Sequence, residues 1–117
     1  MNTNPSNHSL LPHHRLHVYG FAVQLLTAVR DAAIRDTDLR DQALRAAKST
    51  VLNIAEGAAR ISPRDKARAF AIARGEAAEA AAAVEIASLC GDASIESASR
   101  VIALANSVVA MLTKLAK

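Results

Sequence analysis

The fold is decided by residues 46–79, AAKSTVLNIAEGAARISPRDKARAFAIARGEAAE, which predict one helix, a sharp corner and the start of the next helix. At the corner, Ser62 is a favoured N-cap residue and Pro63 suits the first helical position. Asp65 lies three residues after Ser62, close to the spacing of a capping box. A helix is therefore expected to begin just after Ser62.

Apolar residues recur every three or four positions on both sides of this corner, which is the period of one helix face. They are Leu44, Ala47, Val51, Ile54 and Ala58 before the corner, and Phe70, Ala73, Ala77, Ala80, Val84 and Ala87 after it. The two faces can meet in an antiparallel hairpin.

The same period predicts four helices in all. The expected ranges are about 14–34, 38–59, 63–89 and a last helix reaching nearly to Lys117. The first buries Val18, Ala22, Leu25, Val29 and Ala32; Asp36 or Thr37 caps the second, Gly91 ends the third, and Asp92 or Ser94 caps the fourth. Because the connections are short, we expect an all-α, antiparallel up-down-up-down four-helix bundle over residues 13–117, after a disordered arm at residues 1–12.

The last helix carries two adjacent apolar stripes. One consists of Ile95, Ala98, Ile102, Ala105, Val109 and Leu112, and the other of Val101, Leu104, Val108, Met111 and Leu115. One stripe can close the bundle, which would leave the second in water. The pattern, together with a core rich in small alanines, predicts a homo-oligomer.

Composition bounds the class of protein. A chain of 117 residues is one domain, and its single Cys90 excludes an intramolecular disulfide and suits a reducing compartment. We find no stretch that is long and apolar enough to span a bilayer and no signal-peptide region, so we expect a cytoplasmic protein without membrane contact.

Charge is unevenly distributed along the chain. Residues 60–74 hold five Lys or Arg and one acidic residue, whereas residues 75–99 hold five acidic residues and no Lys or Arg. The expected phosphate-binding residues are Arg60, Arg64, Lys66, Arg68 and Arg74, with Arg45 and Lys48 widening the patch. With few aromatic residues nearby, binding of RNA or DNA would be only weakly sequence-specific. The alternative is that these are ordinary solvated charges.

Polar side chains also recur on the two central helices. Asn53, Glu56 and Glu79 are expected to form a structural clamp at the helix interface, with Gly75 leaving room for close approach. His13 and His17 have a helical metal-binding spacing but no further ligand nearby, and Cys90 is expected to be a small buried residue. We therefore predict no catalytic residues, no metal and no cofactor.

Several short motifs together resemble the four-helix-bundle family of 23S rRNA intervening-sequence proteins. They are Asn53-Ile54-Ala55-Glu56-Gly57, Arg60, Ser62, Arg68-Ala69-Phe70, Ile72-Ala73-Arg74-Gly75 and Glu79, with Val18-Tyr19 upstream and Leu89-Cys90-Gly91 and Met111-Leu112 downstream. Glu76 departs from the small residue usual after the Arg-Gly pair.

This resemblance implies a cyclic pentamer. Relatives of the fold include accessory proteins of diversity-generating retroelements, which implies nucleic acid and a reverse transcriptase as partners. The function expected from the resemblance is non-enzymatic nucleic-acid binding or scaffolding. The alternative is a protein-interaction scaffold that binds no nucleic acid.

Overall fold

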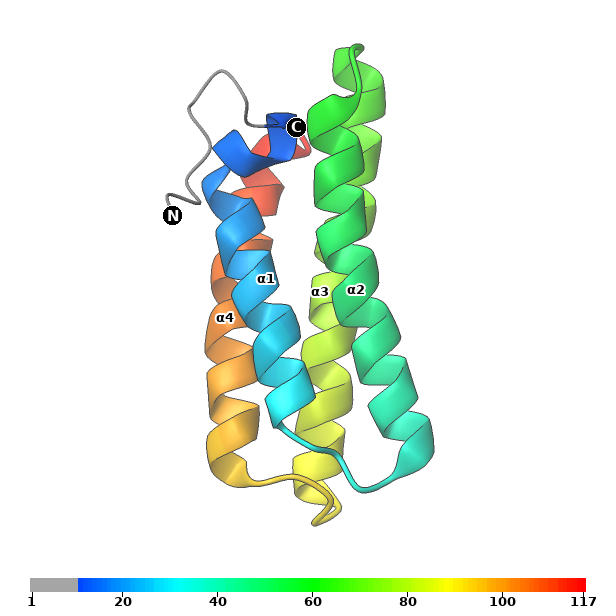
Figure 1. The fold of residues 1–117 in the computed structure, drawn as a ribbon, viewed down its shortest axis with the longest axis vertical. Helices are drawn as coiled ribbons and strands as arrows, with labels where there is room; N and C mark the ends of the chain where they lie inside the picture. The colour runs from blue at the N-terminus through cyan, green and yellow to red at the C-terminus, as the bar shows by residue number, and fades with distance from the viewer. Residues whose placement is uncertain (1–10) are drawn as a thin grey trace, which may run out of the picture.

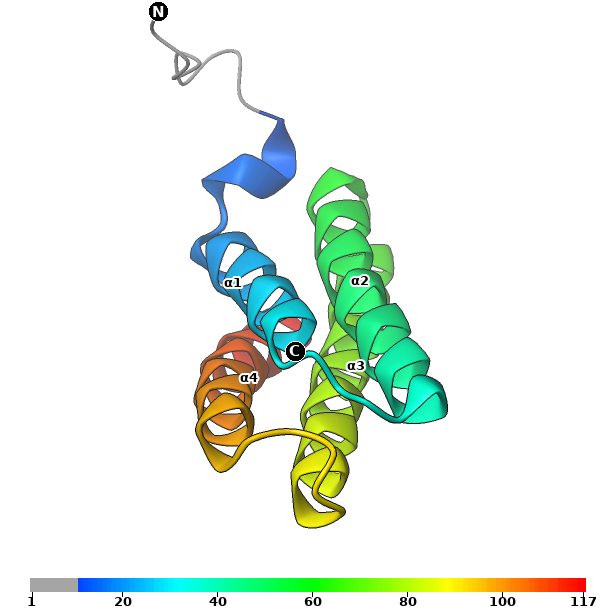
Figure 2. The ribbon, with the colours of Figure 1, turned by 60° about the horizontal axis from the view of Figure 1, so that its bottom comes forward.

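The computed structural model describes residues 11–117, which form four α-helices, a short 3₁₀ helix and no strand (Figure 1). The elements are η2 (Pro12–Arg15), α1 (His17–Asp31), α2 (Thr37–Ala59), α3 (Pro63–Leu89) and α4 (Ile95–Leu115). Each α-helix in Figure 1 runs opposite to the one before it, and α1 and α3 each pack against both α2 and α4 (Figure 2). The predicted all-α four-helix fold is confirmed, whereas the predicted disordered arm lies outside the described residues except for Leu11 and Pro12.

Side-chain caps fix where three of the helices begin. Asp36 Oδ2 accepts the backbone N–H of Leu39 at 2.9 Å, and Ser62 Oγ accepts that of Asp65 at 3.0 Å. At the start of α4, Ser94 Oγ accepts the backbone N–H of Ser97 at 3.0 Å. Each cap satisfies a backbone donor that the helix itself cannot pair, which is worth about 0.5–2 kcal/mol. The cap predicted at Ser62 is confirmed. Of the two alternatives given for each of the other helices, Asp36 caps α2 and Ser94 caps α4.

The first helix is shorter than predicted. Leu16 has an extended backbone and no side-chain cap, so α1 begins only at His17. At the other end Ala33 adopts a left-handed φ of 46°, which stops the helix before Ile34. Ile34 is nonetheless buried, and the next N–H, that of Arg35, donates to the carbonyl of Asp92 at 3.0 Å. The two loops at this end of the bundle are thus joined.

The core is built largely from alanine. The predicted faces of α1 and α3 are buried in full. On α2 the buried face is rotated from the prediction and consists of Ala43, Ala46, Ala47, Thr50, Ile54 and Gly57. Leu44, Val51 and Ala58 are half-buried at its border. The rotation arises because α2 must fit both α1 and α3, and small side chains permit the closer approach.

The prediction that α4 leaves one apolar stripe in water is wrong. Its buried line takes members from both stripes, namely Ala98, Val101, Ala105, Val108 and Leu112. Leu104, Met111 and Val109 flank this line and pack against the same core. Only Ile95 and Leu115 are exposed, because a helix between two neighbours needs a wide apolar face.

The apolar character of α4 also corrects the expectation about membrane spans. Within the described part of the chain, Ile95–Leu115 is long and apolar enough to cross a membrane, by length and composition only. Core helices of soluble proteins meet the same criterion, and here α4 packs against α1 and α3.

Gly57, rather than Gly75, permits the close contact between α2 and α3. A Cβ atom added at Gly57 would lie 2.7 Å from Cε1 of Phe70, whereas one added at Gly75 would have no atom within 4 Å. Gly75 is on the exposed side of α3, so its predicted role is wrong. The close approach of α2 and α3 therefore lies about one helical turn before the corner that joins them.

Candidate nucleic-acid interface

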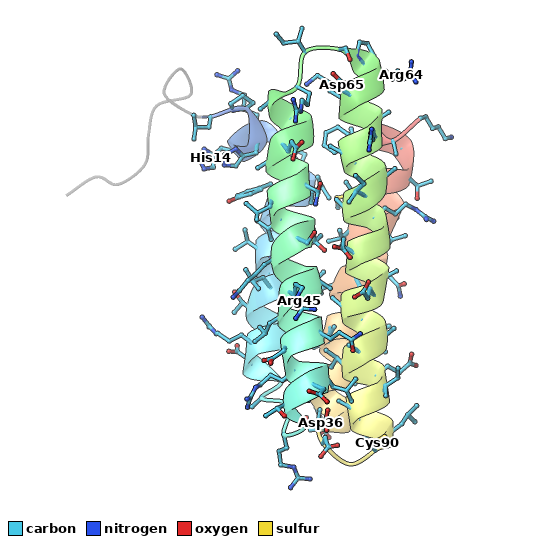
Figure 3. All side chains as sticks on the ribbon, turned by 90° about the vertical axis from the view of Figure 1, so that its right-hand side faces the viewer. His14, Asp36, Arg45, Arg64, Asp65 and Cys90 are labelled. Carbon is cyan, nitrogen blue, oxygen red and sulfur yellow. The ribbon has the colours of Figure 1, made fainter. Side chains whose placement is uncertain are left out.

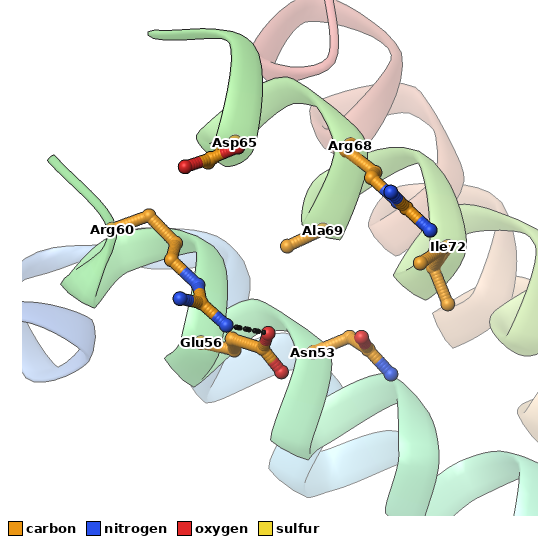
Figure 4. A pocket seen from close by; sticks show the side chains of 7 residues that line it. All are labelled: Asn53, Glu56, Arg60, Asp65, Arg68, Ala69 and Ile72. Carbon is orange, nitrogen blue, oxygen red and sulfur yellow. Dashed lines mark hydrogen bonds and ion pairs between the residues drawn. The ribbon is translucent and has the colours of Figure 1, made fainter. Parts of the chain in front are cut away.

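The corner between α2 and α3 forms a shallow pocket of about 400 Å³. Its lining residues are Asn53, Glu56, Arg60, Asp65, Arg68, Ala69 and Ile72 (Figure 4). On the α2 side, Arg60 Nη2 lies 2.6 Å from Glu56 Oε2, and both side chains are about half exposed. The hydrogen bond that Arg60 donates to the Glu56 carboxylate, together with the negative charge of Glu56, raises the pKa of Arg60.

Lys66 is engaged within the fold. Its Nζ donates to the backbone carbonyls of Gly57 at 3.3 Å and Ala58 at 3.0 Å. These carbonyls belong to the last turn of α2, whose acceptors have no partner within the helix, so the ammonium completes the helix end. The structure thus places this predicted phosphate-binding residue in a structural role.

The other predicted basic residues are dispersed. Arg74 Nε donates to Thr113 Oγ1 at 2.7 Å and so joins α3 to α4. Arg45 lies about midway along α2, far from Arg64 at the corner (Figure 3). Lys48 lines a separate pocket between α1 and α2. Arg60 and Arg68 line the corner pocket, and Arg64 lies in the first turn of α3, one turn before Arg68. We call these three residues the corner cluster.

The predicted polar clamp is not formed. Asn53 Nδ2 donates within its own helix, to the carbonyl and the hydroxyl of Ser49 at 2.9 and 3.1 Å. Glu56 pairs with Arg60, also on α2, and Glu79 is exposed on α3. The predicted clamp between the two helices is therefore wrong, because Asn53 and Glu56 are paired within α2 and Glu79 is exposed.

Antiparallel packing collects positive charge at one end of the bundle, which we call the basic end. Residues 11–24, 49–74 and 106–117 make up this end and hold eight Lys or Arg against two acidic residues. The eight are Arg15, Arg60, Arg64, Lys66, Arg68, Arg74, Lys114 and Lys117. The rest of the described chain holds six Lys or Arg against nine acidic residues. Sequence reasoning found the corner but missed the contribution of Arg15, Lys114 and Lys117.

The basic end also holds an aromatic group that sequence reasoning missed. The ring centroids of His13 and His14 are 4.2 Å apart, and those of His13 and Tyr19 are 4.6 Å apart. Burial, and then the charge of His14, lowers the pKa of His13 from its usual value. We call these three residues the ring cluster. The 3₁₀ turn brings them together, so no helical or strand period signals the arrangement.

Other candidate chemistry is sparse in the described residues. His13 belongs to η2 and His17 to α1, so they do not share the single helix that their metal-binding spacing requires. Within residues 11–117, no group of three or more His, Cys, Asp or Glu side chains could hold a metal ion. Cys90 is exposed, which contradicts its predicted burial, because α3 ends there and the chain turns at Gly91 with a φ of 81°.

The fold and the site define a class: a small all-α four-helix bundle with one strongly basic end. The model of the 23S rRNA-intervening sequence protein family matches residues 15–114, and the chain belongs to this family. No curated protein matches the chain.

Proposed function

We propose that this protein is a non-enzymatic nucleic-acid-binding protein that contacts the phosphate backbone with the corner cluster. The observation that carries the proposal is the concentration of arginines at the basic end: Arg60 and Arg68 line the corner pocket (Figure 4), and Arg64 lies at the start of α3 (Figure 3). Arg64 and Arg68 are one helical turn apart on α3, and both are exposed, as is Arg60. Membership of a family named for an rRNA insertion is consistent with this proposal.

Phosphate contacts of this kind give affinity with little sequence preference. Guanidinium groups can hold phosphate oxygens through two parallel hydrogen bonds, and the first turn of α3 adds the partial positive charge of a helix N-terminus. Such contacts read no base edges. We therefore propose binding that is weakly sequence-specific and strongly salt-dependent.

Neutralising the corner cluster tests the proposal. We expect the triple variant Arg60→Gln, Arg64→Gln and Arg68→Gln to bind a short RNA or DNA roughly tenfold or more weakly at low salt. Each lost phosphate contact should lower the slope of log affinity against log salt by about 1. Fluorescence anisotropy with labelled strands at several salt concentrations measures both quantities.

The matched control is the triple variant Arg30→Gln, Arg40→Gln and Arg100→Gln, which removes the same charge from exposed positions outside the basic end. It should retain most of the affinity. Equal weakening by the two triple variants would show that net charge alone governs binding, and absence of binding by the natural protein at low salt would refute the proposal.

Glu56 is expected to weaken phosphate binding by the corner cluster. Its carboxylate is hydrogen-bonded to Arg60 and adds a negative charge where phosphate would bind. Glu56→Gln should therefore tighten binding about two- to fivefold at low salt, with a smaller gain at high salt because of screening. Glu85→Gln, which removes the same charge outside the basic end, is the control for this comparison. Weaker binding by Glu56→Gln would instead mean that the carboxylate holds Arg60 in its binding geometry.

We also propose a homo-oligomer, for which the resemblance implies a pentamer. The apolar face of α4 packs against the core of the bundle. The exposed apolar side chains that favour association include Ile72, Ile86 and Leu89 of α3. A separate groove of about 300 Å³, between α3 and α4, is lined mainly by small and apolar side chains. Light scattering should give a mass several times the 12.3 kDa of one chain, and a monomer at micromolar concentration would contradict this.

The second candidate function is a protein-interaction scaffold that binds no nucleic acid. The same exposed apolar side chains favour it, and a reverse transcriptase is the partner that the resemblance implies. In that case the natural protein and both triple variants would fail alike to bind labelled strands at low salt.

A further inference from the structure

We propose that the ring cluster of His13, His14 and Tyr19 stacks an unpaired nucleobase, which makes single-stranded nucleic acid the preferred ligand. This inference rests on the proposed function. It adds a second, chemically different subsite to the phosphate contacts of the corner cluster.

The three rings form one compact group. The centroids of His14 and Tyr19 are 5.8 Å apart with an interplanar angle of 87°, while His13 is tilted against both rings at 46° and 59°. Tilted and edge-to-face pairs leave ring faces that are not covered by a parallel partner. His14 is exposed, and His13 and Tyr19 are half-buried, so the group is anchored on one side and open on the other.

The rings are held in place before any ligand binds. The backbone N–H of Leu11 donates to Nδ1 of His14 at 3.2 Å, which fixes the orientation of that ring. Tyr19 packs against the hydrophobic core, and η2 packs against both α1 and α2. A preorganised aromatic surface loses little conformational entropy on binding, which favours stacking over rearrangement.

Basic side chains lie at the same end of the bundle as the ring cluster. Arg15 lies between the rings in sequence, and Arg15, His17 and Lys114 line an adjacent pocket between the ends of α1 and α4. Figures 1 and 2 both show η2 beside the C-terminal half of α2, and Figure 3 shows His14 at the same end of the bundle as Arg64. Aromatic rings within a basic surface are the combination that single-strand binding proteins use.

Duplexes cannot use this subsite, because their bases are paired and stacked on one another. A single strand can place its phosphates on the corner cluster and an unpaired base on the rings. Stacking is tolerant of base identity, since every base has an aromatic face. The inference therefore predicts that the protein prefers single strands to duplexes and discriminates little between base sequences.

Tyr19 itself provides the measurement. It is the single tyrosine of the chain, which has no tryptophan, so tyrosine fluorescence reports on this one side chain. The probes are a short oligothymidylate and a strand of the same length with the same phosphates but no bases. We expect the oligothymidylate to quench Tyr19 fluorescence and to bind at least about fivefold more tightly than the abasic strand.

Variants separate stacking from support of the fold. Tyr19→Phe should retain the preference for the strand with bases, whereas Tyr19→Leu, which keeps apolar bulk, should lose it. His14→Ala changes an exposed ring and should reduce the preference even if Tyr19→Leu proves unstable. Melting temperatures of all variants show whether the bundle is intact.

The outcomes for the two proposals are distinct. Equal affinity for the two strands, or a preference that survives Tyr19→Leu in a folded variant, overturns the stacking subsite and leaves phosphate binding by the corner cluster standing. Absence of binding to either strand overturns both.

Discussion

Ile54→Ala is expected to lower the free energy of unfolding by about 2–5 kcal/mol, toward the upper end of that range. Ile54 is fully buried and is one of the few large side chains in the core. Most of the other buried residues on α2 and α3 are alanines, which have no flexible side chain to fill the space left behind. The cavity should therefore persist, and its cost adds to the lost burial of the side chain.

Leu52→Ala is the matched control for this experiment. Leu52 lies on the same helix two residues away but is 69% exposed. Its truncation should change the free energy of unfolding by less than about 0.5 kcal/mol. Urea unfolding followed by circular dichroism, at one protein concentration, measures both variants, since unfolding of an oligomer depends on concentration. Equal costs at the two positions would contradict the burial pattern of α2.

Gly57→Ala is expected to destabilise the protein by about 1–3 kcal/mol, although alanine is the better helix former. The new Cβ would lie 2.7 Å from Cε1 and 2.9 Å from Cδ1 of Phe70. Phe70 is itself buried, so its ring can move only by disturbing the core between α2 and α3. The steric cost should exceed the gain in helix propensity, which is about 1 kcal/mol.

Gly75→Ala should have the opposite sign. This glycine is also within a helix, but an added Cβ meets no atom within 4 Å. The variant should gain roughly 0.5–1 kcal/mol from helix propensity alone. Thermal melting of the two variants gives the comparison, and Gly57→Ala combined with Phe70→Leu should recover part of the loss. A stabilised Gly57→Ala variant would mean that the two helices lie farther apart than the structure shows.

Ile54 and Gly57 lie close to the corner cluster in the sequence of α2, so changing them can also affect nucleic-acid binding. Gly57 and Ile54 hold the last turns of α2 against α3, and those turns carry Arg60 and the carbonyls that accept from Lys66. A variant that separates the helices would disperse the corner cluster without removing any charge. Loss of binding therefore tests phosphate contact only in variants whose melting temperature is unchanged.

The sequence alone determined the number and order of the α-helices in residues 11–117, the cap at Ser62 and the buried faces of α1 and α3. These features are local: Ser62 caps a helix through the N–H three residues later, and Phe70, Ala73 and Ala77 share a face because of the helical period. The apolar pattern of α4 is also visible in the sequence, but how much of it is buried depends on how many helices pack against α4. The wrong prediction of a free stripe on α4 followed from assuming a single neighbour.

Only the tertiary structure decided which basic residues remain available. Lys66 reaches back to the end of α2, and Arg74 reaches across to Thr113 of α4, so each is held by a residue on another helix. The same packing brings η2 and the end of α4 to the end of the bundle that holds the corner, and a 3₁₀ turn gathers His13, His14 and Tyr19. Local periodicity specifies a helix and its faces, whereas a surface is made by the register and direction of helices that meet from far along the chain.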